Sequence, residues 1–218
     1  LAAGIATYRA YLEAGGKEPS MMAGHSLGEY TALVVAGSLS FADALKLVRL
    51  RAELMQSAVP QGTGSMAAIL GLDDDAVRAV CAEAAQGEVV EAVNFNSPGQ
   101  VVIAGSIAAV ERAIETAKAK GAKRALPLPV SVPSHCLLMK PAAEKLAEAL
   151  KAVDIQPPKI PVIHNADVAS YNNAEQIKDA LVRQLYSPVR WTETVNALVA
   201  QGIIQSAECG PGKVLAGL

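Results

Sequence analysis

The stretch Met21-Met22-Ala23-Gly24-His25-Ser26-Leu27-Gly28-Glu29-Tyr30 decides the predicted architecture of this chain. Its first half is a short apolar run that indicates a buried strand at residues 21–25, and residues 27–36 are typical of a helix that ends before Gly37. Gly24-His25-Ser26-Leu27-Gly28 between them fits G-x-S-x-G, the nucleophile elbow, in which a strand passes through a tight turn into a helix. The sequence therefore predicts a strand–turn–helix unit with a serine at its apex.

Such a turn has chemical consequences for Ser26 and Leu27. The turn lifts the Ser26 hydroxyl out of the sheet, and the Leu27 amide begins the helix, where free N–H groups stabilise an oxyanion. The alternative is a glycine-flanked helix end at which Ser26 is only a cap. The strand before the motif and the helix after it favour the nucleophile.

Outward from this unit, the rhythm of the chain changes twice. Residues 1–14 are predicted to be helical, and a helix at 41–57 has Ser40 as its cap. Between residues 61 and 131 the pattern becomes β-α-β-β-α-β, which matches the ferredoxin-like split βαβ motif. We interpret 61–131 as a ferredoxin-like subdomain inserted into a larger domain.

The larger domain resumes after the insertion. Strands at 160–165 and 203–208 alternate with helices at 140–153, 174–186 and 192–201. Alternating strands and helices predict an open parallel sheet with helices on both faces. The expected fold class is α/β, with a discontinuous hydrolase-like domain formed by 1–60 and 132–218.

Composition excludes several classes of protein. A net charge of −2 does not fit a nucleic-acid binder, which needs a basic excess. No apolar run approaches the ~20 residues that span a bilayer, so no membrane association is expected. The cysteines Cys81, Cys136 and Cys209 lack metal-site spacing, so no metal is expected, and their odd number favours a reducing compartment.

A nucleophilic serine needs a general base, and this chain offers three histidines. His25 adjoins Ser26, where neighbouring side chains diverge. His164 lies in the apolar run 160–165, which is typical of a hydrogen-bonded core histidine. His135 lies on a loop stiffened by Pro129 and Pro133. Spacing alone leaves the choice between His135 and His164 open.

Helix 41–57 places one arginine where an arginine is unexpected. At ~100° per residue, Arg49 lies opposite the apolar arc, whereas Arg51 falls inside it. A guanidinium that faces the interior needs an anionic partner. The partner is either an Asp or Glu in a structural ion pair or the carboxylate of a ligand, which the guanidinium fork binds with two hydrogen bonds.

Helical phase also places Gln184 on the inward face of helix 174–186, in line with Ile177 and Leu181. An inward glutamine ties its helix to a neighbouring loop or orients a catalytic histidine. The residues alone do not separate these two roles.

Several motifs together carry a family resemblance. The chain resembles the malonyl-CoA:acyl-carrier-protein transacylases of bacterial type II fatty acid synthesis from Leu1 to Leu218. The motifs that carry this resemblance lie at residues 24–30, 62–68, 94–100, 132–135, 190–192 and 210–215.

This resemblance implies a ping-pong transfer of malonyl from coenzyme A to an acyl carrier protein, for fatty acid biosynthesis. It implies Ser26 as nucleophile and His135 as base, in a dyad oriented by a backbone carbonyl near Gln184. It also implies Arg51 as the residue that holds the malonyl carboxylate, and the Leu27 amide as oxyanion donor. No cofactor is implied, because coenzyme A arrives with the substrate, and the family suggests a cytoplasmic monomer.

The sequence departs from the family pattern at its ends. The family begins with a strand and a G-Q-G-S-Q loop, whose glutamine is a second oxyanion donor, and it continues past the position of Leu218. We therefore expect a chain truncated at both ends. One oxyanion donor stabilises the transition state by about 2.7–4 kcal/mol in comparable sites. We therefore expect the parent protein to be an active transferase and do not assign activity to this stretch by itself.

Two other functions fit parts of the sequence. A serine esterase or thioesterase of the α/β-hydrolase class would use His164 or His135 with Asp154 or Asp167; only Asp154 followed by His164 fits the chain order Ser, acid, His. A carrier-protein docking module without catalysis would use the basic residues between 118 and 124, whose alternative role is an ordinary solvated face.

Overall fold

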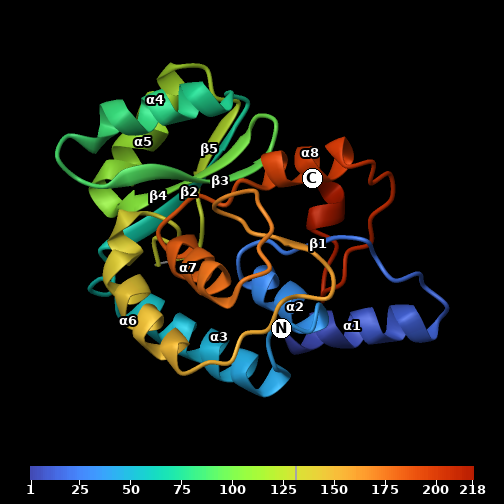
Figure 1. Cartoon of the computed structure of the whole chain (residues 1–218). Helices are drawn as coiled ribbons and strands as arrows, with labels where there is room; N and C mark the ends of the chain where they lie inside the picture. Colours follow the sequence, from blue (N-terminus) through green and yellow to red (C-terminus); the bar gives the residue numbers. More distant parts are fainter. Residues whose placement is uncertain (131) are drawn as a thin grey trace.

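The computed structural model describes residues 1–130 and 132–218. Two regions of sheet organise the chain: a two-stranded parallel sheet, β1 with β6, and a four-stranded antiparallel sheet in the order β3-β4-β2-β5. Figure 1 shows the antiparallel sheet with α4 and α5 on one side and helices α3, α6 and α7 grouped below it. The predicted α/β class is confirmed.

The unit around the parallel pair consists of β1 Met22–Ala23, α2 Leu27–Val35, α3 Phe41–Gln56, α6 Lys140–Lys151, β6 Val162–Ile163, α7 Ala174–Gln184 and α8 Trp191–Ala200, with α1 Ala2–Glu13 packed on α2. Met22 pairs with Val162 and Ala23 with Ile163. Ser40 caps α3 as predicted, because its Oγ accepts the Asp43 N–H at 3.0 Å.

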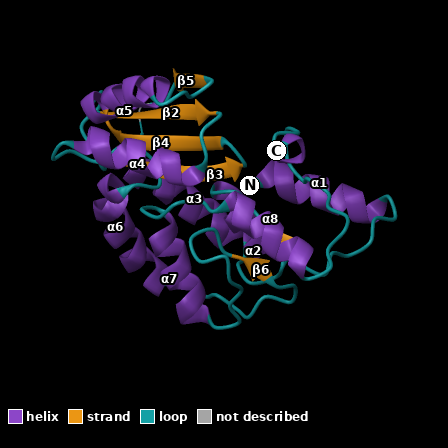
Figure 2. Cartoon of the chain, turned by 90° about the horizontal axis from the view of Figure 1, so that it is seen from above, coloured by secondary structure: helices purple, strands orange, loops and turns teal. Residues whose placement is uncertain are grey.

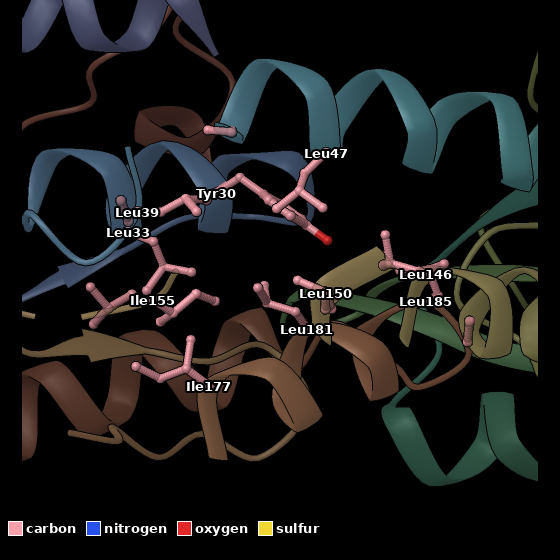
Figure 3. Close-up of a cluster of buried hydrophobic side chains, with 14 of the residues drawn as sticks. Tyr30, Leu33, Leu39, Leu47, Leu146, Leu150, Ile155, Ile177, Leu181 and Leu185 are labelled. Carbon is pink, nitrogen blue, oxygen red and sulfur yellow. The ribbon is translucent and has the colours of Figure 1, made fainter. Parts of the chain in front are cut away.

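The largest core lies between α2, α3, α6 and α7. Leu33 of α2, Leu146 of α6 and Leu181 of α7 are fully buried in it. Figure 3 shows these side chains converging from separate helices, with Tyr30 and Leu47 along the top of the cluster. Burial of apolar surface stabilises a fold by about 25 cal/mol per Å², so this core holds in place the helices that carry the candidate active site.

The inserted region has the predicted strand and helix order. It comprises β2 Gly64–Leu70, α4 Asp74–Ala85, β3 Val90–Ser97, β4 Gln100–Ser106, α5 Ile107–Ala119 and β5 Arg124–Pro127. Figure 2 shows its strands side by side in the order β5-β2-β4-β3, the ferredoxin-like arrangement. The domain limits at 60/61 and 131/132 stay a prediction, and Ser131 lies outside the described residues.

The two regions are joined by the chain just before α8. Val189 N–H donates to the carbonyl of Val93, and Phe95 N–H donates to the carbonyl of Val189, so this segment pairs with β3. Cys136 packs on the other face of the same sheet, away from α4 and α5. The segment that carries His135 is therefore held against the inserted sheet.

One predicted strand is wrong. Residues 203–208 have no ladder partner among the described residues, and Ile204 is 99% exposed. A strand exists only by pairing with a neighbour, and no described strand lies beside this segment. Short 3₁₀ turns occur at Leu137–Met139 and Leu215–Gly217. Among the helices of residues 1–130 and 132–218, none has the length and apolar character of a membrane span.

Candidate active site

Ser26 sits at the apex of the turn between β1 and α2, in a strained conformation. Its φ of 52° and ψ of −111° lie in a region that non-glycine residues rarely adopt. The turn depends on Gly24, since a Cβ there would lie 2.0 Å from the backbone C and O of Gly28. A Cβ on Gly28 would meet nothing within 4 Å, so only the first glycine of the motif is needed for the close approach.

Two side chains from distant elements hold the backbone of Ser26. Its N–H donates to Oδ1 of Asn165 at 2.6 Å, and its carbonyl accepts from Nε2 of Gln184 at 3.0 Å. Asn165 also donates from Nδ2 to the carbonyl of Gly24 at 2.8 Å. These bonds offset backbone strain that costs about 1–3 kcal/mol.

The hydroxyl of Ser26 faces His135. Oγ lies 2.8 Å from Nε2 of His135, and Nδ1 of the same ring lies 2.7 Å from the backbone carbonyl of Gln184. A carbonyl only accepts, so Nδ1 carries the proton and Nε2 presents its lone pair to the hydroxyl. The Gln184 carbonyl thus orients the imidazole as a general base, the role that a carboxylate has in a Ser-His-Asp triad.

The environment keeps His135 neutral. Its side chain is buried, and burial together with the nearby Arg51 cation lowers the pKa of His135 from 6.5 to about 3. A neutral imidazole accepts a proton, which is the form that serine activation requires.

Arg51 of α3 lies beside the same hydroxyl. Its side chain is buried, and Nη2 donates to Oγ of Ser26 at 3.1 Å and to Oε1 of Gln184 at 3.2 Å. Within the described residues no carboxylate forms an ion pair with it, and Nε has no hydrogen-bond partner. A structural ion pair is therefore excluded, and the guanidinium keeps donors for an anionic ligand.

Leu27 supplies the first amide of α2, directly after Ser26. Among residues 1–130 and 132–218, this N–H donates no hydrogen bond. A free amide at a helix N-terminus next to the nucleophile is suited to an oxyanion. The structure thus brings all five predicted site residues together: Ser26, Leu27, Arg51, His135 and Gln184.

His164 does not take part in a triad with Ser26. It is buried, and its Nδ1 lies 2.7 Å from Oε1 of Glu29. Asp154 is exposed and accepts from Gln156, while Asp167 pairs with Arg183. The arrangement that an esterase would need is absent from these residues.

Sequence reasoning missed Asn165, Glu29 and the pairing of His25. Asn165 follows β6 at the carboxyl end of the parallel pair, the edge at which open α/β sheets bind ligands, and that position was an available signal. His25 Nε2 lies 2.9 Å from Oδ1 of Asn96 at the end of β3, so the inserted sheet reaches the elbow. No three described His, Cys, Asp or Glu side chains converge as metal ligands.

Comparisons with known proteins agree with this geometry. Residues 2–215 match the family described as the acyl transferase domain. The malonyl CoA-acyl carrier protein transacylase of Escherichia coli K12 is 61% identical over 218 residues, which cover 100% of this chain and 71% of the relative.

Solved structures give the same result. An acyl carrier protein S-malonyltransferase from Vibrio cholerae superposes with a TM-score of 0.97 at 61% identity, over 100% of this chain and 71% of that one. A malonyl-transacylase in complex with its type II PKS acyl-carrier protein superposes with a TM-score of 0.98 at 60% identity, over 100% of this chain and 70% of that one. The chain therefore belongs to the acyl transferase domain family and, within it, to the malonyl CoA-acyl carrier protein transacylases.

Proposed function

We propose that this protein transfers a malonyl group from malonyl-CoA to the phosphopantetheine thiol of an acyl carrier protein, through an ester on Ser26. The observation that carries the proposal is the position of the Ser26 Oγ, between a neutral imidazole at 2.8 Å and a buried guanidinium at 3.1 Å. The first group activates the hydroxyl. The second selects an acyl group that ends in a carboxylate.

In the first half-reaction, Nε2 of His135 takes the Ser26 proton as Oγ attacks the thioester carbonyl. The Leu27 N–H receives the oxyanion of the tetrahedral intermediate. When the C–S bond breaks, the imidazolium returns its proton to the coenzyme A sulfur. The product is a malonyl-serine ester whose free carboxylate is held by Arg51.

In the second half-reaction, His135 takes the proton of the carrier protein's thiol. The sulfur attacks the ester carbonyl, the C–O bond to Ser26 breaks, and the proton passes to Oγ. Each half begins and ends with a neutral imidazole, which matches the lowered pKa of His135. Orientation of the ring by the Gln184 carbonyl lets it serve both thiol and hydroxyl without turning.

The partner and setting follow from the relatives. Relatives named for an acyl carrier protein, one of them in complex with a type II PKS acyl-carrier protein, support the carrier protein as acceptor. Fatty acid biosynthesis as the purpose follows from the family resemblance of the sequence. The three free thiols fit a cytoplasmic location. A monomeric state rests on the family resemblance alone.

Intact-mass measurement after exposure to malonyl-CoA tests the proposal. We expect one malonyl adduct, mapped by peptide sequencing to Ser26 and discharged by holo acyl carrier protein. Ser26→Ala should show no adduct. Malonyl found on a cysteine, or equal labelling of Ser26→Ala, would overturn the assignment of the nucleophile.

A further inference from the structure

Glu29 is a buried acid that the mechanism above does not use. It lies in the first turn of α2, three residues after the nucleophile, and its side chain has no exposed surface. Three N–H groups point at its carboxylate: Nδ1 of His164 at 2.7 Å, the amide of Asn165 at 2.9 Å and Nε2 of Gln184 at 3.0 Å. A buried carboxylate that accepts several N–H bonds is held in one position.

Two of these donors are the residues that fix the nucleophile. Asn165, anchored through its backbone N–H, accepts the Ser26 N–H with its side chain. Gln184, anchored through Nε2, donates from the same atom to the Ser26 carbonyl. One carboxylate therefore supports both sides of a strained residue.

The same carboxylate fixes which way the Gln184 amide points. Nε2 faces Glu29, so Oε1 faces Nη2 of Arg51 at 3.2 Å. The reverse orientation would place an amide oxygen against the carboxylate and an NH₂ against the guanidinium, which is unfavourable at both ends. The backbone carbonyl of Gln184 meanwhile orients His135. Glu29 thus reaches nucleophile, base and cation through a single neighbour.

The local sequence would assign Glu29 a simpler task. Ser26-x-x-Glu29 fits the capping box, in which the serine hydroxyl caps the helix and the glutamate bonds the serine N–H. The structure uses neither bond: Ser26 makes no side-chain cap, and its N–H goes to Asn165. Releasing the hydroxyl from capping leaves Oγ available to His135.

We propose that Glu29 is a positioning residue for the acyl transfer, acting through Asn165 and Gln184 to hold Ser26, His135 and Arg51 in register. The inference rests on the proposed function. Glu29 touches no reacting atom, so its loss should slow acylation of Ser26 without abolishing substrate binding.

The variants separate hydrogen bonding from charge. Glu29→Ala removes the shared acceptor of three donors, and only Gln184 Nε2 keeps another acceptor, the Ser26 carbonyl. Glu29→Gln keeps all three contacts, because its oxygen serves Asn165 and Gln184 while its NH₂ meets Nδ1 of His164. The His164 ring proton then moves to Nε2, which has no hydrogen-bond partner within the described part of the chain. Glu29→Asp shortens the side chain and retracts the acceptor. Leu33→Ala, in the same helix and fully buried, is the control for a loss of stability alone.

Acylation of Ser26 by malonyl-CoA in a single turnover is the main measurement. A 1 Å misplacement costs about 100-fold, so we expect a loss of that order for Glu29→Ala, mainly in kcat, and recovery to within about tenfold in Glu29→Gln. Leu33→Ala should lower the unfolding temperature but acylate normally where it is folded.

Proton NMR gives a second readout that a merely structural role would not move. The wild type and Leu33→Ala should show the low-field signal of the His135 Nδ1 proton, and folded Glu29→Ala should lose or shift it. Folded Glu29→Ala that acylates as fast as Leu33→Ala would overturn the inference. If the alanine variant does not fold, Glu29→Asp decides: a wild-type rate there overturns the inference, and a reduced rate with an altered Nδ1 signal supports it. A wild type that forms no malonyl adduct would instead refute the proposed function.

Discussion

Nη2 of Arg51 lies 3.1 Å from Oγ of Ser26, so a buried cation and the nucleophile share one site. Arg49, two residues earlier on α3, is 82% exposed and pairs with Glu53 on the surface. The helix thus carries one buried arginine at the site and one exposed arginine on the surface. Replacing each in turn gives a test variant and a matched control.

Arg51→Ala should reduce malonyl transfer by about 100-fold or more, because truncating a buried, hydrogen-bonded charge costs about 2–5 kcal/mol. Acetyl transfer should fall far less, since an acetyl group has no carboxylate to hold. Parallel assays with malonyl-CoA and acetyl-CoA measure the ratio, and Arg49→Ala should leave it unchanged. Equal losses for both substrates in Arg51→Ala would contradict the carboxylate role.

Arg51→Ala should also raise the pKa of His135. Burial is the main cause of the lowered value and the Arg51 cation is the second, so removing the cation favours the imidazolium. Titration of the imidazole resonances by NMR measures the change. A His135 pKa that stays at the wild-type value would show that burial alone sets it.

Stability should depend on pH through His135. The pKa of His135 is about 3 in the folded protein, and its ordinary value of 6.5 applies in the unfolded chain. Between pH 3 and 6.5 the His135 imidazole is therefore protonated in the unfolded chain but not in the folded protein. The free energy of unfolding should therefore fall as pH falls from 6.5 to 3, by at most about 1.4 kcal/mol per pH unit from this residue. Above 6.5 the contribution vanishes.

Denaturant unfolding of the wild type and His135→Asn at several pH values tests this dependence. The variant should lose less stability on acidification than the wild type. Parallel curves for the two proteins would show that His135 is not the group responsible.

Gly24→Ala should destabilise the elbow by about 3 kcal/mol, as overpacking against backbone does, because its Cβ would lie 2.0 Å from the C and O of Gly28. Gly28→Ala should be neutral or slightly stabilising, since a Cβ there meets nothing within 4 Å and alanine favours helix. Urea unfolding of the two variants measures the contrast. Similar unfolding free energies would refute the close-approach argument.

The fold was largely predictable because its signals are local. The strand–turn–helix of the elbow and the inserted β-α-β-β-α-β order follow from hydrophobic periods of 2 and 3.6 residues, and both occur in the structure. The strand expected at 203–208 does not form, because a strand needs a pairing partner that local signals cannot supply. A favourable local pattern does not make a strand without a neighbour to pair with, and Ile204 is left exposed.

The sequence by itself determined that Ser26 lies in a turn between a strand and a helix and that Arg51 faces inward while Arg49 does not, because turn geometry and helical phase depend on adjacent residues. The family resemblance implied His135 as the base, but the residues themselves left His135 and His164 open, and the tertiary structure shows that His135 meets the hydroxyl while His164 meets Glu29. It also shows that no carboxylate of the described residues forms an ion pair with the guanidinium. Such partners lie far apart in the chain, 109 residues for Ser26 and His135. The carbonyl of Gln184 that orients the base has no signature of its own in the residues, because every residue carries a carbonyl and only packing selects one. Before the structure, only the family resemblance pointed to it.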